Sequence, residues 1–460
     1  MKAYNSRLST KVTGGESRPT RKLPHKFTMA LAGAISLVGV SAHAQEAQQA
    51  QAAPAAAPAK PPAAWVDGIT QSFWIEGGST FNTVKKPGDR NFGRLFDDKT
   101  NSFQLNQMTY TIQRKIDSTL PTYDFGFKLQ GMYGSDARYT HFLRELQNAT
   151  GDSINQFDIV EANLQLHTPW FTDGGFDIKA GQYPTLEGLE TIDPTTNYLY
   201  SHSYIFNFGI PLKHTGFITV LHATPMVDLY AGMDTGVNTS IGSGDNNDSV
   251  SFHGGVGLNL LDGNLTVLAT THIGPENAKN AANGSTLPIG ADKKNRYLND
   301  IATTWKFNDK LTFLNELNYI EDDCQAVGAA GASKCGTARA YGVAQYGIYQ
   351  LDDVFTLVGR AEVFRDEEGA FVGQFNDNLD FVRAEEGDPA KGVVLFGGRT
   401  TYLGLTGGVN IKPALSIPLV SSLVIRPEVR YDTSLNNTKP FGNNTKGDQV
   451  TVASDFILQF

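Results

Sequence analysis

Short segments in which apolar and polar residues alternate recur from residue 69 to the end of the chain, and they constrain the fold more than any other feature. In residues 123–133, aromatic and aliphatic side chains at odd positions alternate with Asp124, Lys128 and Gln130. Successive strand side chains point to opposite faces, so each segment predicts a strand with one apolar and one polar face. We expect strands at 69–82, 102–116, 122–134, 156–168, 174–183, 213–223, 226–237, 250–261, 264–274, 296–307, 310–321, 338–351, 354–366, 399–411, 421–433 and 448–460.

The connections between these segments alternate between long and short. Short ones carry turn residues, such as Asp262-Gly263 and Asn308-Asp309, whereas long ones such as 242–249 are rich in Gly, Asn, Asp and Ser. An even strand count with this alternation is typical of outer-membrane barrels, with short periplasmic turns and long extracellular loops. A sheet in lipid must close, and about sixteen strands enclose a wet lumen. The sequence therefore predicts an all-β, transmembrane antiparallel barrel.

The first 64 residues predict export. Four basic residues between 18 and 26 precede the apolar run 27–40, and Ala42-His43-Ala44 has the small-x-small pattern of a cleavage site. We expect a cleaved signal peptide at 1–44, a flexible Ala/Pro-rich periplasmic leader at 45–64 and the barrel at 65–460. The apolar run is too short for a transmembrane anchor.

The charge balance excludes nucleic acid as a partner. The full chain has 38 Lys and Arg and 47 Asp and Glu, and residues 1–44 hold seven of the basic and one of the acidic residues. The mature chain therefore carries 31 basic and 46 acidic residues, a net charge of −15, whereas nucleic-acid binding needs a basic surface. No apolar stretch beyond the N-terminus has the roughly 18 residues that a membrane-spanning helix requires.

The motif that runs from Gly174 to Thr185, Gly-Gly-Phe-Asp-Ile-Lys-Ala-Gly-Gln-Tyr-Pro-Thr, continues with Gly188-Leu189-Glu190, Asn197, Ser201, Ser203-Tyr204 and Pro211. In these residues the chain resembles the OmpL-like putative beta-barrel porin family over about residues 65–460. The resemblance implies an outer-membrane porin in the bacterial cell outer membrane and supplies no catalytic residues. The chain ends on the aromatic Phe460, as outer-membrane barrels do, and we expect the barrel-assembly machinery to recognise this last strand.

The third long connection, 184–212, is the main candidate for a functional segment. It holds Glu187, Glu190 and Asp193 together with seven apolar or aromatic residues between Tyr198 and Phe208. A loop in water would not normally expose so many aromatic side chains, so we expect it to fold into the lumen and narrow it, as the third loop of general porins does. Basic residues at polar positions of the strands would face its acids across a constriction: Lys128, Lys179, Arg360, Arg426 and Arg430.

These features predict a porin for passive diffusion of small hydrophilic solutes or ions. Acidic positions on the polar strand faces outnumber basic ones, which predicts a weak cation preference. A channel selective for sugars or organic acids is a close variant; an outer-membrane barrel enzyme and a plugged structural or adhesive barrel are the rivals. We expect no enzyme activity, and we expect contact with outer-membrane lipid and lipopolysaccharide. A homotrimer is a possible assembly.

The histidines do not predict a metal site. Seven remain after cleavage, at 141, 167, 202, 214, 222, 253 and 272, and none has a short ligand spacing such as H-E-x-x-H. No G-x-S-x-G motif is present. We therefore expect neither a bound metal nor a cofactor.

Cys324 and Cys335 both lie in the connection 321–337, and they are the only cysteines in the chain. An exported protein matures in an oxidising compartment, which favours a disulfide that closes this loop. Thiol titration of the unfolded, non-reduced protein should therefore find no free thiol, and reduction should release two. Two thiols before reduction would contradict the prediction.

Overall fold

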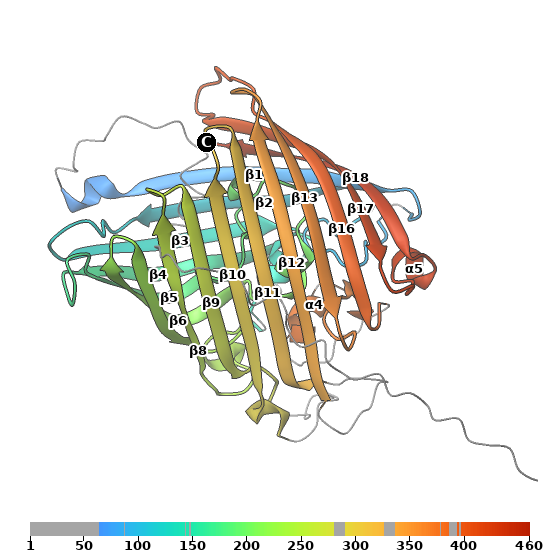
Figure 1. The fold of residues 1–460 in the computed structure, drawn as a ribbon, viewed down its shortest axis with the longest axis horizontal. Coiled ribbons are helices and arrows are strands. Elements are labelled where there is room, and N and C mark those ends of the chain that lie inside the picture. The colour runs from blue at the N-terminus through green and yellow to red at the C-terminus, as the bar shows by residue number, and fades with distance from the viewer. Residues whose placement is uncertain are drawn as a thin grey trace, which may run out of the picture. The chain divides into compact units, whose positions relative to one another are not determined.

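The computed structural model describes residues 64–460 except for 87, 143, 147–148, 280–289, 326–335, 378, 386–392 and 395–396. Sixteen strands form one closed antiparallel barrel, in the spatial order β1-β18-β17-β16-β13-β12-β11-β10-β9-β8-β7-β6-β5-β4-β3-β2 (Figure 1). All sixteen expected strands are confirmed, with small shifts at their ends. They are β1 (Thr70–Asn82), β2 (Phe103–Arg114), β3 (Asp124–Gly134), β4 (Gln156–Thr168), β5 (Phe176–Pro184), β6 (Lys213–Thr224), β7 (Val227–Asp234), β8 (Ser251–Leu260), β9 (Leu265–Pro275), β10 (Asn295–Lys306), β11 (Leu311–Gln325), β12 (Gly336–Gln350), β13 (Phe355–Asp366), β16 (Thr400–Ile411), β17 (Ser422–Ser434) and β18 (Asp448–Gln459).

The first and last strands close the ring. Strand β1 pairs with β18 in a register that places Trp74 opposite Gln459 and Asn82 opposite Thr451. At the end of this seam the Phe460 amide donates to the Phe73 carbonyl at 2.9 Å, and the two rings lie 5.4 Å apart between centroids. Closure leaves no open sheet edge, which is what a sheet in lipid requires.

The outer and inner faces of the wall differ as the alternation predicts. On β3 the outward Phe125 and Leu129 are exposed, whereas the inward Asp124 and Gln130 are buried. Beside one of the short turns, the rings of Trp305, Phe307 and Phe313 pack together on the outer face. An apolar outer band edged by aromatic residues is the surface that faces lipid in outer-membrane barrels. None of the helices in the described ranges has the length and hydropathy of a membrane-spanning helix.

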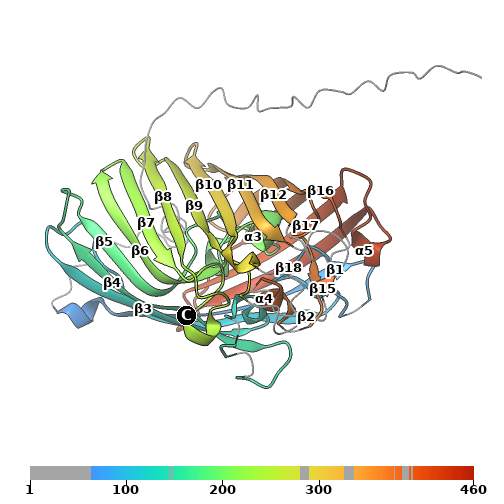
Figure 2. The same ribbon diagram turned by 90° about the horizontal axis from the view of Figure 1, so that it is seen from below.

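Several long connections pack against one another inside the ring of strands. Figure 2 shows α3 and α4 between the wall made by β6 to β12 and the wall made by β17, β18, β1 and β2. Phe92, Tyr139, Phe206, Phe381 and Tyr402 belong to one buried apolar cluster formed by these connections and the strands. The small elements of the connections are η1 (Trp65–Gly68), α2 (Ala137–Thr140), η2 (Pro194–Thr196), α3 (Tyr204–Phe208), η3 (Gly242–Gly244), η5 (Ala291–Lys293), α4 (Asp380–Glu385), α5 (Phe441–Asn444) and the paired strands β14 (Gln374–Phe375) and β15 (Val393–Val394).

Sequence analysis did not predict β14, β15 or the inward packing of the connections 83–102, 135–155 and 367–399. Period-2 alternation marks only segments with two distinct faces, and these connections bury apolar residues without any regular period. Arg90-Asn91-Phe92-Gly93-Arg94-Leu95-Phe96 is such a segment, dense in aromatic and charged residues.

Gly181 is a position on β5 that only glycine suits. Its φ is +129°, and a Cβ there would lie 2.2 Å from the Ala162 carbonyl oxygen of β4. Such a φ is strained for any residue with a side chain. By contrast, a Cβ at Gly347 on β12 would meet no atom within 4 Å.

Gly181→Ala should therefore lower the free energy of unfolding by roughly 1–3 kcal/mol through backbone strain and the clash with β4. Urea unfolding in detergent, followed by tryptophan fluorescence, measures the change. Gly347→Ala is the matched control and should stay within about 0.5 kcal/mol of the parent. Equal midpoints for the two variants would contradict this account of Gly181.

Candidate functional site

Segment 184–212 joins β5 to β6 and reaches the strands across the ring from them. The Tyr204 amide donates to Glu362 Oε2 on β13 at 2.6 Å, and the Tyr200 amide donates to Glu428 Oε2 on β17 at 2.9 Å. The Tyr204 ring also stacks on Tyr402 of β16 with centroids 4.9 Å apart. In the strand order, β13 and β16 lie opposite β5 and β6. The contacts therefore run across the interior of the barrel.

Local capping gives the segment its shape. Ser203 is the N-cap of α3, and its Oγ accepts a hydrogen bond from the Phe206 amide at 3.1 Å. Asp193 caps η2 in the same way through the Thr195 amide at 2.9 Å. Caps of this kind satisfy amides that a short helix leaves open. The apolar side of α3 is then buried, with Ile205 and Phe206 in the cluster that fills the interior.

Arg360 of β13 holds one acid of the segment. Its Nη1 lies 2.7 Å from Glu190 Oε1 and donates to the Ser201 carbonyl at 2.7 Å. The second oxygen of Glu190 accepts from the Ser203 amide at 2.7 Å and lies 3.2 Å from His202 Nδ1. All these groups are buried. Arg360 and Glu190, both expected at a constriction, thus form a direct ion pair.

Two further arginines bind main-chain carbonyls of the segment. Arg426 of β17 donates to the carbonyls of Pro194 at 3.0 Å and Asn197 at 2.7 Å, and it pairs with Asp455 on β18 and Glu76 on β1. Arg430 donates to the His202 carbonyl at 2.5 Å. A guanidinium offers five donors in a fixed plane, so one side chain serves a carboxylate and a carbonyl together.

Arg430 also joins the segment to the network behind it. It pairs with Glu362 at 3.0 Å and with Asp432 at 2.8 Å, and Asp432 in turn binds Arg94 of the connection 83–102 at 2.8 Å. Arg94 is fully buried. Sequence analysis did not single it out. The sequence feature that could have indicated a role for Arg94 is the density of charged and aromatic residues at 90–98.

Burial opposes ionisation of Glu190, but the charge of Arg360 and the hydrogen bond from His202 outweigh it and hold the pKa of Glu190 well below its usual range. Glu187 differs. Burial, with the nearby charges of Asp300 and Asp234, raises the pKa of Glu187 well above its usual range. Neither carboxylate oxygen of Glu187 has a hydrogen-bond partner among the described residues. The two acids therefore have opposite electrostatic surroundings.

The remaining expected residues lie on the side of β3, β4 and β5. Lys128 of β3 pairs with Glu161 of β4 at 2.5 Å, and Lys179 of β5 is close enough to act on the same carboxylate. Burial raises the pKa of Asp193, and the charge of Lys128 opposes that rise. Lys128 and Lys179 are only half-buried, unlike the three arginines. The expected site residues thus form two groups, one on β13 and β17 and one on β3 and β5.

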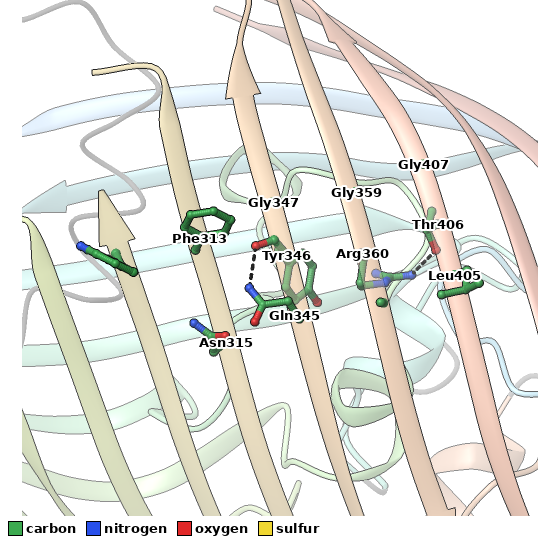
Figure 3. A pocket seen from close by; sticks show the side chains of 12 residues that line it. Phe313, Asn315, Gln345, Tyr346, Gly347, Gly359, Arg360, Leu405, Thr406 and Gly407 are labelled. Carbon is green, nitrogen blue, oxygen red and sulfur yellow. Dashed lines mark hydrogen bonds between the residues drawn. The ribbon is translucent and has the colours of Figure 1, made fainter. Parts of the chain in front are cut away.

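A separate groove of about 790 Å³ opens on the outer face of the wall, over β11, β12, β13 and β16 (Figure 3). Gly347, Gly359 and Gly407 form its floor because they pair in register across β12, β13 and β16. The exposed side chains of Trp305 and Leu405 and the half-buried ring of Phe313 border it. The groove lies on the opposite side of the wall from segment 184–212.

Cys324 is fully buried near the end of β11. Cys335 lies outside the described residues, so the Cys324–Cys335 disulfide stays a prediction. The signal peptide and leader also lie in the undescribed part of the chain, apart from residue 64.

Three comparisons place this geometry among known proteins. A family model described as "Putative beta-barrel porin-2, OmpL-like" matches residues 68–460. The fold is similar to the outer membrane channel DcaP of Acinetobacter baumannii, at 8% identity and a TM-score of 0.50 over 85% of this chain and 97% of that one. It is also similar to an anion-selective porin from Comamonas acidovorans, at 10% identity and a TM-score of 0.51 over 85% and 99% of the two chains. No curated protein matches the chain.

Glu190→Gln should lower the free energy of unfolding at pH 7 by about 3–5 kcal/mol, because it removes one partner of a buried ion pair. The folded pKa of Glu190 is lowered, so its stabilisation is complete above about pH 4.3, the ordinary value for glutamate, and is lost as the pH falls through the folded value. The difference between parent and variant should therefore shrink in acid. Urea midpoints at pH 7 and pH 3 measure both effects.

Glu367→Gln is the control for this substitution. Glu367 pairs with Arg365 at 2.9 Å, but both side chains are partly exposed. A surface pair contributes about 0–1 kcal/mol, so the control should change stability little at either pH. A loss in Glu190→Gln no larger than in the control would mean that the pair does not hold the segment.

Proposed function

The chain belongs to the family of OmpL-like beta-barrel porins, and we propose that it is a passive diffusion channel for small hydrophilic solutes or ions whose bore is narrowed by segment 184–212. The porin fold and family membership support a channel, and no step of chemistry is needed for diffusion. A channel that prefers sugars or organic acids is the close variant of this function.

One observation carries the proposal: segment 184–212 is held against one wall and leaves the other wall less covered. Three buried arginines on β13 and β17, Arg360, Arg426 and Arg430, bind main-chain carbonyls of the segment, and Arg360 also binds Glu190. On the opposite side the inward side chains of Lys128, Gln165 and Lys179 remain half-buried. A water-filled path beside β3, β4 and β5 fits this difference, with Asp193 and Lys128 at its edge.

Lining charge would set the ion preference of this path. Charged side chains around a pore select ions by sign. The basic residues Arg360, Arg426 and Arg430 are each paired with a buried carboxylate. We therefore keep the weak cation preference as a proposal, with Lys128 and Lys179 as the positive groups that limit it.

A plugged structural barrel is the second candidate, because a specific observation favours it. The connections 83–102, 135–155 and 367–399 add buried side chains to those of segment 184–212 inside the ring, including Phe96, Tyr139 and Phe381. Packing of this kind could block the bore completely. A conductance measurement separates an open bore from a closed one.

Several features of export and assembly are also proposals. We propose a signal peptide at 1–44 and a periplasmic leader at 45–64, delivery to the outer membrane, recognition of the last strand and Phe460 by the barrel-assembly machinery, contact with lipopolysaccharide, and a disulfide between Cys324 and Cys335. A homotrimer is the assembly that we would test first.

The purified protein should conduct in planar lipid bilayers, and its reversal potential in a KCl gradient should show a weak cation preference. Lys128→Gln should increase that preference, because it removes a positive charge from the proposed path. Lys310→Gln is the control, since Lys310 is exposed in a short turn and should not affect selectivity. Silent bilayers would favour the plugged barrel, and an anion preference would reject the proposed selectivity.

A further inference from the structure

Four neighbouring strands each contribute one polar residue to a single buried cluster on the inner face of the wall. The residues are His214 of β6, Asp234 of β7, His253 of β8 and His272 of β9, and all four are at most 2% exposed. Strand register brings them together, because His253 pairs with His272 and Gly232 pairs with His253. We call these four residues the histidine cluster.

The carboxylate of Asp234 lies among the three imidazole rings. Its Oδ1 lies 2.9 Å from His272 Nε2, and its Oδ2 lies 3.4 Å from His214 Nδ1 and 3.8 Å from His253 Nδ1. The ring centroids are 4.7 Å apart for His214 and His253, and 4.8 Å for His214 and His272. One nitrogen of each ring therefore lies within 3.8 Å of one carboxylate, and that of His214 also lies 3.2 Å from the Gly236 carbonyl.

The cluster leaves polar atoms without hydrogen bonds. Neither ring nitrogen of His253 has a hydrogen-bond partner among the described residues, and the same holds for His272 Nδ1 and Asp234 Oδ2. A buried polar group without a partner costs about 1–3 kcal/mol. A cation bound between the rings would satisfy several of these atoms at once.

In many metal sites the second nitrogen of a histidine ligand contacts a hydroxyl, carbonyl or carboxylate. His214 has such a contact, because its Nε2 lies 3.1 Å from Thr185 Oγ1, and His272 Nδ1 faces Glu276 Oε1 at 3.7 Å, beyond hydrogen-bond distance. Glu276 is itself fixed by the Ser251 hydroxyl at 2.8 Å and the Val237 amide at 2.7 Å.

We propose that the histidine cluster binds one divalent transition-metal ion of the zinc class, with His214, Asp234, His253 and His272 as its ligands. Three imidazole nitrogens and one carboxylate oxygen make a donor set that suits Zn²⁺, whereas Ca²⁺ and Mg²⁺ require mostly oxygen ligands. Candidate donor atoms of His214, Asp234 and His272 already lie within 4.8 Å of one another. Tetrahedral Zn²⁺ places its donors about 3.3 Å apart, so small side-chain movements suffice.

This proposal departs from the sequence prediction, which expected no metal ligand set. The sequence prediction considered only ligands a few residues apart in one segment. Here each ligand lies on a different strand, so consecutive ligands are separated in the sequence by the connection between two strands and by parts of both strands. The turn Asp262-Gly263 could have predicted that two of these histidines are cross-strand neighbours. His253 and His272 are equally far from its centre, and an antiparallel hairpin must then pair them.

The site lies at the start of segment 184–212. Thr185, which contacts His214, directly follows β5, and the Leu212 amide at the other end of the segment donates to Asn238 of the connection that follows β7 at 2.8 Å. A metal ion in the histidine cluster would therefore link four strands of the wall at the place where the segment leaves it. Its expected effect is structural.

Metal analysis of the protein without a histidine tag tests the proposal. After chelation and dialysis, the folded protein should bind about one equivalent of added Zn²⁺ per chain, and its thermal midpoint should rise. Added Co²⁺ should give the strong visible absorption of a tetrahedral nitrogen and oxygen site. The spectrum needs no variant, so the test does not depend on how a substitution folds.

His253→Gln and Asp234→Asn should weaken Zn²⁺ binding at least roughly 10-fold. His222→Gln is the matched control, because His222 lies at the far end of β6 and pairs with Asp177 and Asp228; it should still bind one equivalent. Folded parent protein that binds no Zn²⁺ and shows no Co²⁺ absorption would overturn the proposal and leave a hydrogen-bonded His–Asp cluster. Unchanged binding in both ligand variants would overturn it as well.

Discussion

The structure depends on buried arginines that satisfy the main chain of a segment crossing the barrel. Segment 184–212 has only short helices, so many of its carbonyls and amides need partners from elsewhere. Arg360, Arg426 and Arg430 supply donors for the carbonyls, and Glu362 and Glu428 accept from the amides. Without these side chains the segment would bury unpaired polar groups, which would oppose the burial of its apolar side chains.

The same interactions explain why the two walls of the barrel differ. On the side of β13 and β17, the charged side chains of the wall pair with the segment and with the connections behind it. The contacts from Arg430 to Asp432 and from Asp432 to Arg94 are an example. On the side of β3 to β5, the inward side chains of Lys128, Gln165 and Lys179 are only half-buried. The proposed diffusion path depends on this difference, since it needs one part of the wall that the segment does not occupy.

Much of the fold could be predicted from the sequence, because alternation and turn residues are local signals that a closed barrel repeats sixteen times. Sequence analysis named both Glu190 of the segment and Arg360 of the wall, and the two form a direct ion pair; that such residues line a constriction stays a prediction. The carbonyl contacts of Arg426 and Arg430 could not be predicted, because they depend on how the main chain folds across the interior. The histidine cluster was missed for a related reason: its residues meet only through strand register.

The central claim is that solutes pass between segment 184–212 and the wall of β3 to β5, and modification of single cysteines in the conducting channel tests it most directly. Gln165→Cys faces the proposed path from β4, and Thr406→Cys faces the interior from β16, where Thr406 contacts Arg360 at 3.3 Å. A bulky, charged thiol reagent should reduce the single-channel current through Gln165→Cys and leave Thr406→Cys unchanged. Block of Thr406→Cys alone would contradict the account.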